Sequence, residues 1–245
     1  MAATGIALFG FVVGHLIGNL QVFGPPEMIN SYGHFLQSKK LLLWTVRLGL
    51  LAIVFVHIVV ASQLTALNRA ARPTQYATKP GWGSTWQSRY MMVSGLVIAA
   101  FVIYHLAHFT ALLPGVNGIG HDFSKLRTVV HGEEAHDVYG MMILGFQVWW
   151  VSLFYIVAQG LLFIHLYHGL ASMLQTVGFR GHALWPPVQR IMRGISIAIF
   201  IGYAIIPIAI YFRVVGNDYA ERKKAEMISA GLVQSAAPVG KEAAK

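Results

Sequence analysis

The chain contains no cysteine among its 245 residues. Disulfide bridges, thiolate zinc sites and iron–sulfur ligation by this chain are therefore excluded. Charge is also scarce: Asp, Glu, Lys and Arg make up 11% of the sequence, whereas a soluble domain carries about 25%. Hydrophobic residues reach 56%, and the mean hydropathy is +0.59. These values together predict an integral membrane protein.

Five apolar segments are long enough to cross a bilayer, which takes about 20 residues in a helix. Within them the sequence has no Asp or Glu, and the charged side chains are Arg47 and Arg213. Proline and glycine clusters in the gaps are typical of turns. We therefore expect an all-α integral membrane bundle of five transmembrane helices. The segments run roughly over residues 4–24, 41–66, 90–113, 141–175 and 194–214.

The predicted bundle forms one domain, residues 1–216, followed by an extramembrane C-terminal tail, residues 217–245. Seven basic residues fall in loops on the N-terminal side, against five, plus the basic tail, on the opposite side. The positive-inside rule then favours a cytoplasmic N-terminus. The net charge of +9 is typical of flanks next to anionic lipid rather than of a stripe that binds nucleic acid.

The first four segments each contain histidine, and the fifth contains none. Ionisable groups are costly in hydrocarbon, so such residues face the interior of a bundle and act there. A single membrane histidine is equally well explained as a hydrogen-bonding contact between helices. Histidines on four helices indicate a common cause. They are His15, His57, His105 with His108, and His165 with His168.

Depth in the membrane supplies that cause. His15 and His105 lie nine and eight residues from the ends of their segments at one surface. His57 and His165 lie nine and ten residues from the segment ends at the other surface. At 1.5 Å per residue, each pair lies roughly 12–15 Å below its own surface. Two level pairs at two depths fit two bis-histidine b-type haems. In the third and fourth segments, spacing alone does not decide which of two histidines is the ligand.

Gly10, Gly14 and Gly18 recur every four residues and give the first segment a smooth face. Such a face packs closely against a neighbouring helix, or it lets a flat porphyrin approach the backbone next to His15. Both interpretations can hold at once.

Several stretches of the sequence occur in an order that identifies a family. They are GHLIGNL (14–20), SRYMMVSG (88–95), FVIYHL (101–106), HDVYGMMILGF (136–146) and LFYIVAQGLLFIHLYHGLASMLQTVGF (153–179). With them the chain resembles the membrane cytochrome b subunit of succinate dehydrogenases and fumarate reductases, in its five-helix, dihaem, single-anchor form. The matching stretches span most of residues 5–180, and the last one is the most specific.

The resemblance implies axial ligands for two haem b irons: His15 with His105 nearer the outside, and His57 with His165 nearer the inside. It implies that His108 and His168 act near the axial ligands or near the haem propionates. Propionates favour cationic neighbours at the membrane edge. Arg47 is placed for the outer haem, and Arg89 and Arg193 for the inner one; snorkelling to the interface explains these arginines equally well.

The resemblance also implies a function. The chain would anchor a flavoprotein and an iron–sulfur subunit to the inner membrane of a prokaryote and pass electrons between them and a membrane quinone, with menaquinone favoured. Succinate chemistry would belong to those partners. A quinone site needs a titratable group near water, although each candidate is at least as well explained as a solvated loop residue. The candidates are Glu27, His34, Glu133, Glu134, His136 and Asp137.

Three alternatives are compatible with parts of the sequence. A dihaem cytochrome b of a hydrogenase or formate dehydrogenase would use the same haem ligation with other partners. A haem-free transporter would use the histidines as a proton relay, but the segments lack Asp and Glu and show no pair of broken helices. A purely structural anchor without haem would not need histidine on four helices.

Overall fold

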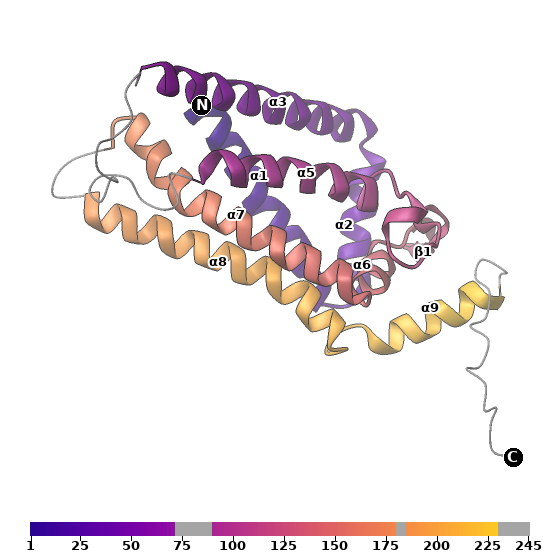
Figure 1. Ribbon diagram of the computed structural model, residues 1–245. Coiled ribbons are helices and arrows are strands. Elements are labelled where there is room, and N and C mark those ends of the chain that lie inside the picture. Colours follow the sequence, from indigo (N-terminus) through magenta and orange to yellow (C-terminus); the bar gives the residue numbers. More distant parts are fainter. Residues whose placement is uncertain (72–89, 180–184, 230–245) are drawn as a thin grey trace, which may run out of the picture.

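The computed structural model describes residues 1–71, 90–179 and 185–229. Within these ranges, five helices are long and apolar enough to span a membrane (Figure 1). This confirms the predicted all-α membrane bundle. The five helices are α1 (Ala2–Leu20), α3 (Lys40–Ala70), α5 (Met91–Phe109), α7 (Trp149–Thr176) and α8 (Trp185–Tyr211).

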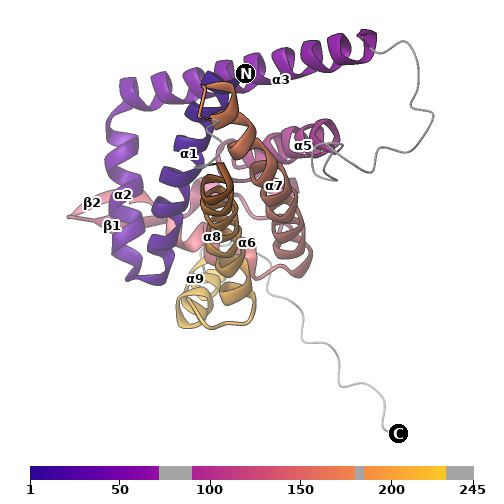
Figure 2. The ribbon, with the colours of Figure 1, turned by 90° about the vertical axis from the view of Figure 1, so that its left-hand side faces the viewer.

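The two ends of the bundle differ in what they carry. The N-terminus lies at the same end as the last turns of α3 and α7 and the start of α8 (Figure 1). We call this the N-terminal end. The opposite end, here the far end, gathers several shorter elements, which Figures 1 and 2 show beside one another. These are α2 (Pro26–Ser38), β1 (Arg127–Val130), β2 (Glu133–His136), α6 (Val138–Phe146) and α9 (Asn217–Ser229).

Several predicted boundaries differ from those in the structure. The third span ends at Phe109 rather than at residue 113. The fourth is two helices, α6 and α7, because Val148 has an extended backbone with φ −80° and ψ 117°. The fifth begins at Trp185, so the Pro186–Pro187 pair lies in its first turn instead of a loop. Proline fits there because first-turn N–H groups have no partner within the helix.

The far end also contains structure that the sequence pattern did not predict. Short 3₁₀ turns occur at Gln21–Phe23, Pro114–Val116 and Phe123–Lys125. Strands β1 and β2 pair antiparallel with Arg127 opposite His136. Positive φ angles at His131 (51°) and Gly132 (83°) close this hairpin, as a tight two-residue turn requires. The predicted tail begins as helix α9, while residues 230–245 lie outside the described part of the chain.

Packing is uneven across the bundle. The main core lies at the far end, where side chains from α6, α7, α8 and α9 meet. Its fully buried members include Val22, Phe123, Ile143, Val151 and Ile210. Helix α7 packs most extensively against α8. In contrast, none of the 31 residues of α3 is buried. In Figure 2 this helix runs along the edge of the bundle opposite α9.

Candidate functional site

The loose packing of α3 coincides with a large, partly open cavity. It has a volume of about 3000 Å³ and is lined by residues of α1, α2, α3, α5 and α7. A ligand pocket ordinarily measures roughly 300–1,000 Å³, so this cavity has room for more than one large group. All four predicted axial ligands line it: His15, His57, His105 and His165.

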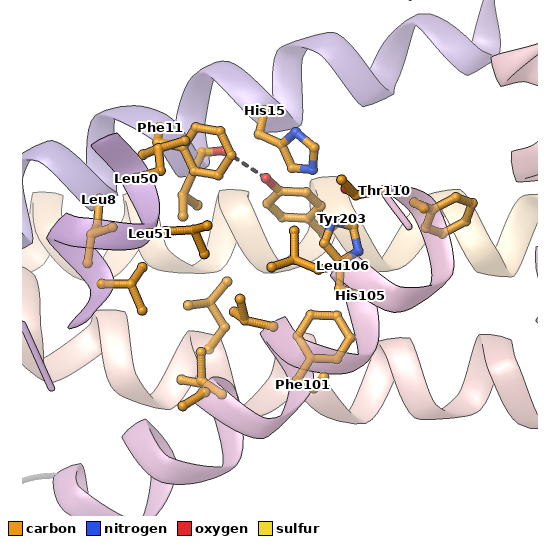
Figure 3. Close-up of a pocket in the computed structure, with 18 of the residues that line it drawn as sticks. Leu8, Phe11, His15, Leu50, Leu51, Phe101, His105, Leu106, Thr110 and Tyr203 are labelled. Carbon is orange, nitrogen blue, oxygen red and sulfur yellow. Dashed lines mark hydrogen bonds between the residues drawn. The ribbon is translucent and has the colours of Figure 1, made fainter. Parts of the chain in front are cut away.

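His15 on α1 and His105 on α5 face each other within this cavity (Figure 3). Their ring centroids are 5.8 Å apart, and the ring planes are inclined by 80°. Metal–imidazole bonds are about 2 Å long. With a ring radius of roughly 1 Å, two imidazoles on opposite sides of one metal ion have centroids about 6 Å apart. The observed separation therefore fits a shared metal.

Aromatic contacts hold His15 in place. The ring of Phe11 stacks on it at 5.2 Å, and the ring of Tyr203 lies 6.4 Å away. The Tyr203 hydroxyl donates to the Val12 carbonyl at 2.7 Å, which ties α8 to α1 (Figure 3). Neither nitrogen of His15 has a hydrogen-bond partner in the described residues. Both are thus available to a ligand.

The glycine face of α1 is open next to His15. A Cβ added at Gly10 or Gly14 would meet no described atom within 4 Å, and Gly14 lines the cavity. Only at Gly18 would it meet a neighbour, the ring of Tyr32 at 3.1 Å. Close helix packing therefore explains Gly18 but not Gly14. A bare backbone beside the cavity leaves space for a flat ligand.

His57 and His165 lie nearer the N-terminal end, and each has a hydroxyl partner. Thr4 Oγ1 is 2.9 Å from Nδ1 of His57, and Ser94 Oγ is 3.2 Å from Nδ1 of His165. The two imidazoles lie within electrostatic range of each other. A hydroxyl that accepts from Nδ1–H fixes the tautomer with a free Nε2, as metal-binding histidines require.

These contacts arrange the site in two tiers. The near tier contains Thr4, His57, Ser94 and His165, and the far tier contains His15, His105 and Tyr155. On α1, His15 follows Thr4 by eleven residues, and on α5, His105 follows Ser94 by eleven residues. Eleven residues of helix rise by about 16 Å. Both helices therefore give the same separation between the tiers.

The donor set in each tier is compatible with haem. Among the described residues, no three His, Cys, Asp or Glu side chains converge to hold a bare metal ion. Two imidazoles per tier are too few to hold a bare metal ion. They are the number of protein ligands that a metal needs when a macrocycle supplies its other four ligands. The large apolar cavity around them provides the corresponding space.

The two additional histidines lie in different surroundings. His168 lines the cavity near His165. His108 does not line it: its side chain is fully buried among Phe109, Phe123 and Tyr155. His105, three residues earlier in the sequence, lines the cavity instead. The structure thus distinguishes two histidines that spacing alone leaves equivalent.

The predicted arginines differ in whether they line the cavity. Arg47 lines the cavity, with its guanidinium carbon 5.4 Å from the Trp44 ring. Arg193 is exposed, and its guanidinium lies 5.1 Å from the Tyr167 ring outside the cavity lining. Arg89 falls outside the described residues. Arg47 is therefore the predicted arginine that the structure brings to the cavity.

Three of the six quinone candidates line the far end of the same cavity: His34, Glu134 and His136. They form a polar rim with Arg127 of β1, whose Nε is 3.1 Å from Glu134 Oε1. His34 Nε2 lies 3.1 Å from Oε2 of Glu133, which is largely exposed. We refer to His34, Arg127, Glu134 and His136 as the far rim.

His136 has a defined tautomer. An Arg127 guanidinium nitrogen donates to its Nδ1 at 2.8 Å, and because guanidinium never accepts, the proton of neutral His136 must be on Nε2. That Nε2 is buried without a hydrogen-bond partner in the described residues. Burial foremost, and then the Arg127 charge, lower the pKa of His136, while the Leu126 carbonyl and the Asp137 charge act in the opposite direction. His136 thus lines the cavity and has a buried donor that is not paired within the described residues.

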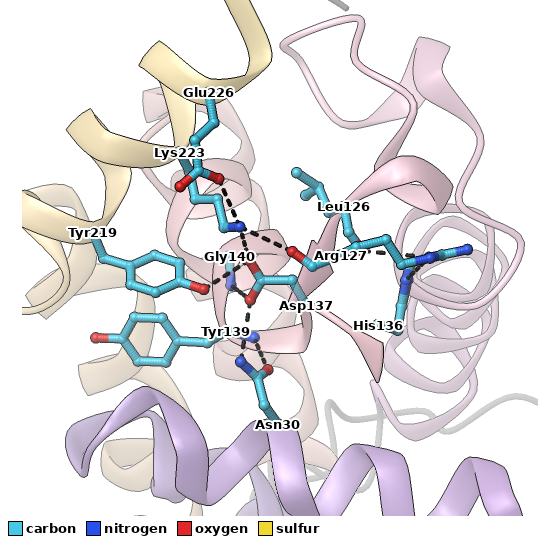
Figure 4. Close-up of polar contacts among 10 residues, drawn as sticks. All are labelled: Asn30, Leu126, Arg127, His136, Asp137, Tyr139, Gly140, Tyr219, Lys223 and Glu226. Carbon is cyan, nitrogen blue, oxygen red and sulfur yellow. Dashed lines mark hydrogen bonds and ion pairs between the residues drawn. The ribbon is translucent and has the colours of Figure 1, made fainter. Parts of the chain in front are cut away.

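Asp137 serves a different purpose from its neighbour. Its carboxylate is fully buried and caps α6 by accepting from the Gly140 backbone N–H at 2.9 Å. It also accepts from Asn30 at 3.2 Å and from the Tyr219 hydroxyl at 2.8 Å, and Lys223 Nζ lies 3.5 Å away (Figure 4). All of its bonding capacity is used within the protein. Asp137 therefore joins α2, α6 and α9 rather than facing a ligand.

Glu27 is exposed in the first turn of α2 and does not line the cavity. Sequence reasoning also missed several residues that the structure brings to the site: Thr4, Ser94, Arg127 and Tyr155. For Thr4 and Ser94, a signal was present, since each hydroxyl precedes a histidine of the other tier by eleven residues on its helix. Arg127 and Tyr155 become neighbours of histidines only through the hairpin and the tertiary packing.

Comparisons with protein-family models, with curated proteins and with solved structures find no match to this chain. A functional assignment therefore depends on the geometry of the cavity and on the resemblance of the sequence stretches described above.

Proposed function

We propose that this chain is a dihaem cytochrome b that anchors a succinate:quinone oxidoreductase in the membrane. One observation carries the proposal: four histidines from four spanning helices line one large cavity in two tiers, with two imidazoles in each. The family resemblance of the sequence supports the same assignment. Haem bound in each tier would supply a one-electron iron couple.

The residues of the chain perform distinct tasks in this proposal. His15 and His105 would hold the far-tier iron, and His57 and His165 would hold the near-tier iron. Thr4 and Ser94 keep the near-tier imidazoles in the tautomer that leaves Nε2 free, which raises their basicity as ligands. Arg47, at the far-end part of α3, provides positive charge for a propionate at the cavity wall.

The far rim is the proposed quinone-facing surface. His136 presents an Nε2–H without an acceptor, and a quinone carbonyl is a hydrogen-bond acceptor of the kind that it lacks. His34 and Glu134 line the same part of the cavity, and their side chains are partly exposed to solvent at the far end of the bundle. They offer a route for the protons that quinone reduction consumes. Menaquinone is favoured by resemblance.

The absence of cysteine fits a division of labour among subunits. Iron–sulfur clusters are held by thiolates, so the electron relay to succinate would belong to an iron–sulfur protein and a flavoprotein. The resemblance places these partners on the cytoplasmic face of a prokaryotic inner membrane. In this arrangement the N-terminal end of the bundle faces them, and the far rim lies at the opposite surface.

The decisive experiment is a haem count on the chain purified in detergent after expression with haem supply. We expect two haems b per chain from the pyridine haemochrome, and a dithionite-reduced minus oxidised difference spectrum typical of bis-histidine ligation. A chain that stays free of haem after reconstitution with hemin would contradict the proposal. The histidines would then be assigned to a proton relay or to helix contacts.

A further inference from the structure

A buried hydrogen-bond chain leads away from the far-tier ligand His105. The Tyr155 hydroxyl on α7 lies 3.3 Å from Nδ1 of His105 and 3.1 Å from Nδ1 of His108. His105 and Tyr155 line the cavity, whereas His108 is fully buried behind them. One hydroxyl thus bridges two imidazoles, only one of which can face a cavity ligand.

The bridge restricts the protonation states of the two rings. A tyrosine hydroxyl has one proton to donate, so it can donate to only one of the two Nδ1 atoms. The Nε2 of His108 has no partner in the described part of the chain, and a Cβ added at Gly145 would lie 3.2 Å from it. Among the described residues, the side chain of His108 therefore has one hydrogen bond, and it is to Tyr155.

Two arrangements satisfy the bridge. In the first, His105 donates from Nδ1–H to Tyr155, and Tyr155 donates to Nδ1 of His108. In the second, both donations are reversed, and His105 carries its proton on Nε2, toward the cavity. A metal bound at His105 Nε2 permits only an arrangement in which Nδ1 is protonated. If both histidines donated, the hydroxyl proton and the His108 Nε2 lone pair would both be buried without partners, which costs more than one unpaired group.

We infer that Tyr155, with His108 behind it, is a positioning residue that fixes the tautomer and ring orientation of His105 and lowers the reduction potential of the far-tier haem. This rests on the proposed function. The mechanism is the usual one for ligating histidines: acceptance of a hydrogen bond from the distal ring nitrogen raises ligand basicity and favours the more highly charged metal state. The second histidine extends the chain, because a hydroxyl that donates is a better acceptor.

The chain gives the two tiers different supports. The near-tier imidazoles contact Thr4 and Ser94, aliphatic hydroxyls that in turn donate to the backbone carbonyls of Met1 and Met91. The His105 imidazole ends on a phenol that is itself bonded to a buried imidazole. A change at Tyr155 should therefore alter one haem and leave the other as an internal reference. The near-tier haem also reports whether the variant has folded.

The test is a redox titration with Tyr155→Phe in the full chain, monitored by visible spectra and by low-temperature EPR. Loss of an outer partner of this kind weakens metal binding about 10–100-fold. A tenfold loss confined to the ferric state corresponds to a rise of about 59 mV for a one-electron couple. We expect a rise of that order for one haem, with a changed EPR signal, and unchanged values for the other.

Tyr104→Phe is the matched control. Tyr104 lies in the same aromatic cluster, 6.0 Å from the Tyr155 ring, but its hydroxyl donates to the Val116 carbonyl at 2.7 Å. The same chemical change there should leave both potentials unaltered. Equal shifts in the two variants would overturn the inference, because they would show a general effect of packing.

His108→Leu tests the outer half of the chain. We expect a smaller rise than with Tyr155→Phe, and no further rise when both changes are combined, since the influence of His108 passes through Tyr155. Additive shifts would overturn this order. If the wild-type chain binds two haems and Tyr155→Phe changes neither, the inference alone fails; a wild-type chain without haem removes the proposed function as well.

Discussion

The α6–α7–α8–α9 side of the molecule and the α3 side both contain apolar spanning helices but differ in how they pack. On the first side, Ile143, Val151 and Ile210 have no exposed surface. On the second side, α3 buries none of its residues and borders a cavity of about 3000 Å³. Protein interiors normally leave few voids larger than a water molecule. This open space is the one that we propose is filled by haem.

The polar residues divide in the same way. At the packed far end, Asp137 has every oxygen engaged by protein donors. In the cavity, His15 has no hydrogen-bond partner among the described residues, and His57 and His165 have one each. Polar groups that make all of their hydrogen bonds within the protein stabilise the fold. Polar groups that lack hydrogen-bond partners and surround a cavity are available to bind a ligand. This difference distinguishes the polar residues that stabilise the fold from those that are available to bind a ligand.

The largest effect is expected from removal of a ligand. His105→Ala should remove the far-tier haem and His165→Ala the near-tier haem, so each variant should retain one haem of two. Measurement is by pyridine haemochrome per chain. His131→Asn is the control, because this histidine is exposed at the hairpin turn with φ 51° and lies outside the cavity lining, and Asn tolerates that conformation.

The same variants probe the contrast between the two sides. A bound group stabilises the folded state by mass action, and the cavity side has little packing of its own. In the haem-depleted chain, hydrogen exchange should therefore increase along α3 and remain slow around Ile143 and Ile210. Equal loss of protection on both sides would mean that the cavity side does not depend on a ligand.

A second large effect concerns the packed far end. Asp137→Ala would leave Lys223, Asn30 and the Tyr219 hydroxyl without their shared acceptor, and loss of one partner of a buried ion pair costs about 3 kcal/mol or more. Glu133→Ala removes a contact with His34 in which the Glu133 side chain is 73% exposed, so its effect should be small. Thermal unfolding in detergent, with haem content held constant, measures both. Similar midpoints for the two variants would contradict the structural role of Asp137.

A smaller, more local effect is expected in the near tier. Ser94→Ala and Thr4→Ala remove the hydroxyl partners of His165 and His57 and should weaken near-tier haem retention about tenfold. Ser196→Ala is the matched control, since this buried serine on α8 donates only to the Met192 carbonyl of its own helix. Haem transfer to apomyoglobin measures retention. Loss of the far-tier haem instead would show that the tiers are assigned to the wrong partners.

The depth argument groups histidines by counting residues along a helix. Helix rise is fixed at 1.5 Å per residue, so counting from a segment end locates a side chain along the bilayer normal even when the end is off by a few residues. Rotation about the helix axis is less certain. His108 follows His105 by three residues and is turned by about 60° from it, which is enough to take it from the cavity into the core.

Contacts between distant segments could not be read from the sequence. Asp137 looks like any loop carboxylate until α9, some eighty residues later, covers it with Tyr219 and Lys223. The break at Val148 lies within a long, mostly apolar run in which Gln147 is the polar neighbour, so hydropathy joined α6 to α7. In the same way, Tyr155 gave no signal, because its significance depends on α5 and α7 packing side by side.

The smallest expected effect is a pH dependence at the far rim. Burial and the Arg127 charge lower the pKa of His136 below its usual 6.5 in the folded chain. The unfolded chain therefore binds a proton more readily than the folded chain, and stability is full above pH 6.5 and decreases as the pH falls below it. His121, whose pKa is also lowered by burial, contributes in the same direction.

Glu134, His34 and Asp137 also lie near His136, so the test compares two proteins in which these three groups are the same. His136→Gln retains a donor of similar size but does not titrate, so its thermal midpoint should decrease less between pH 7.5 and 5.5 than that of the unaltered chain. Parallel decreases in the two proteins would mean that His136 accepts a proton in the folded state as easily as in the unfolded one.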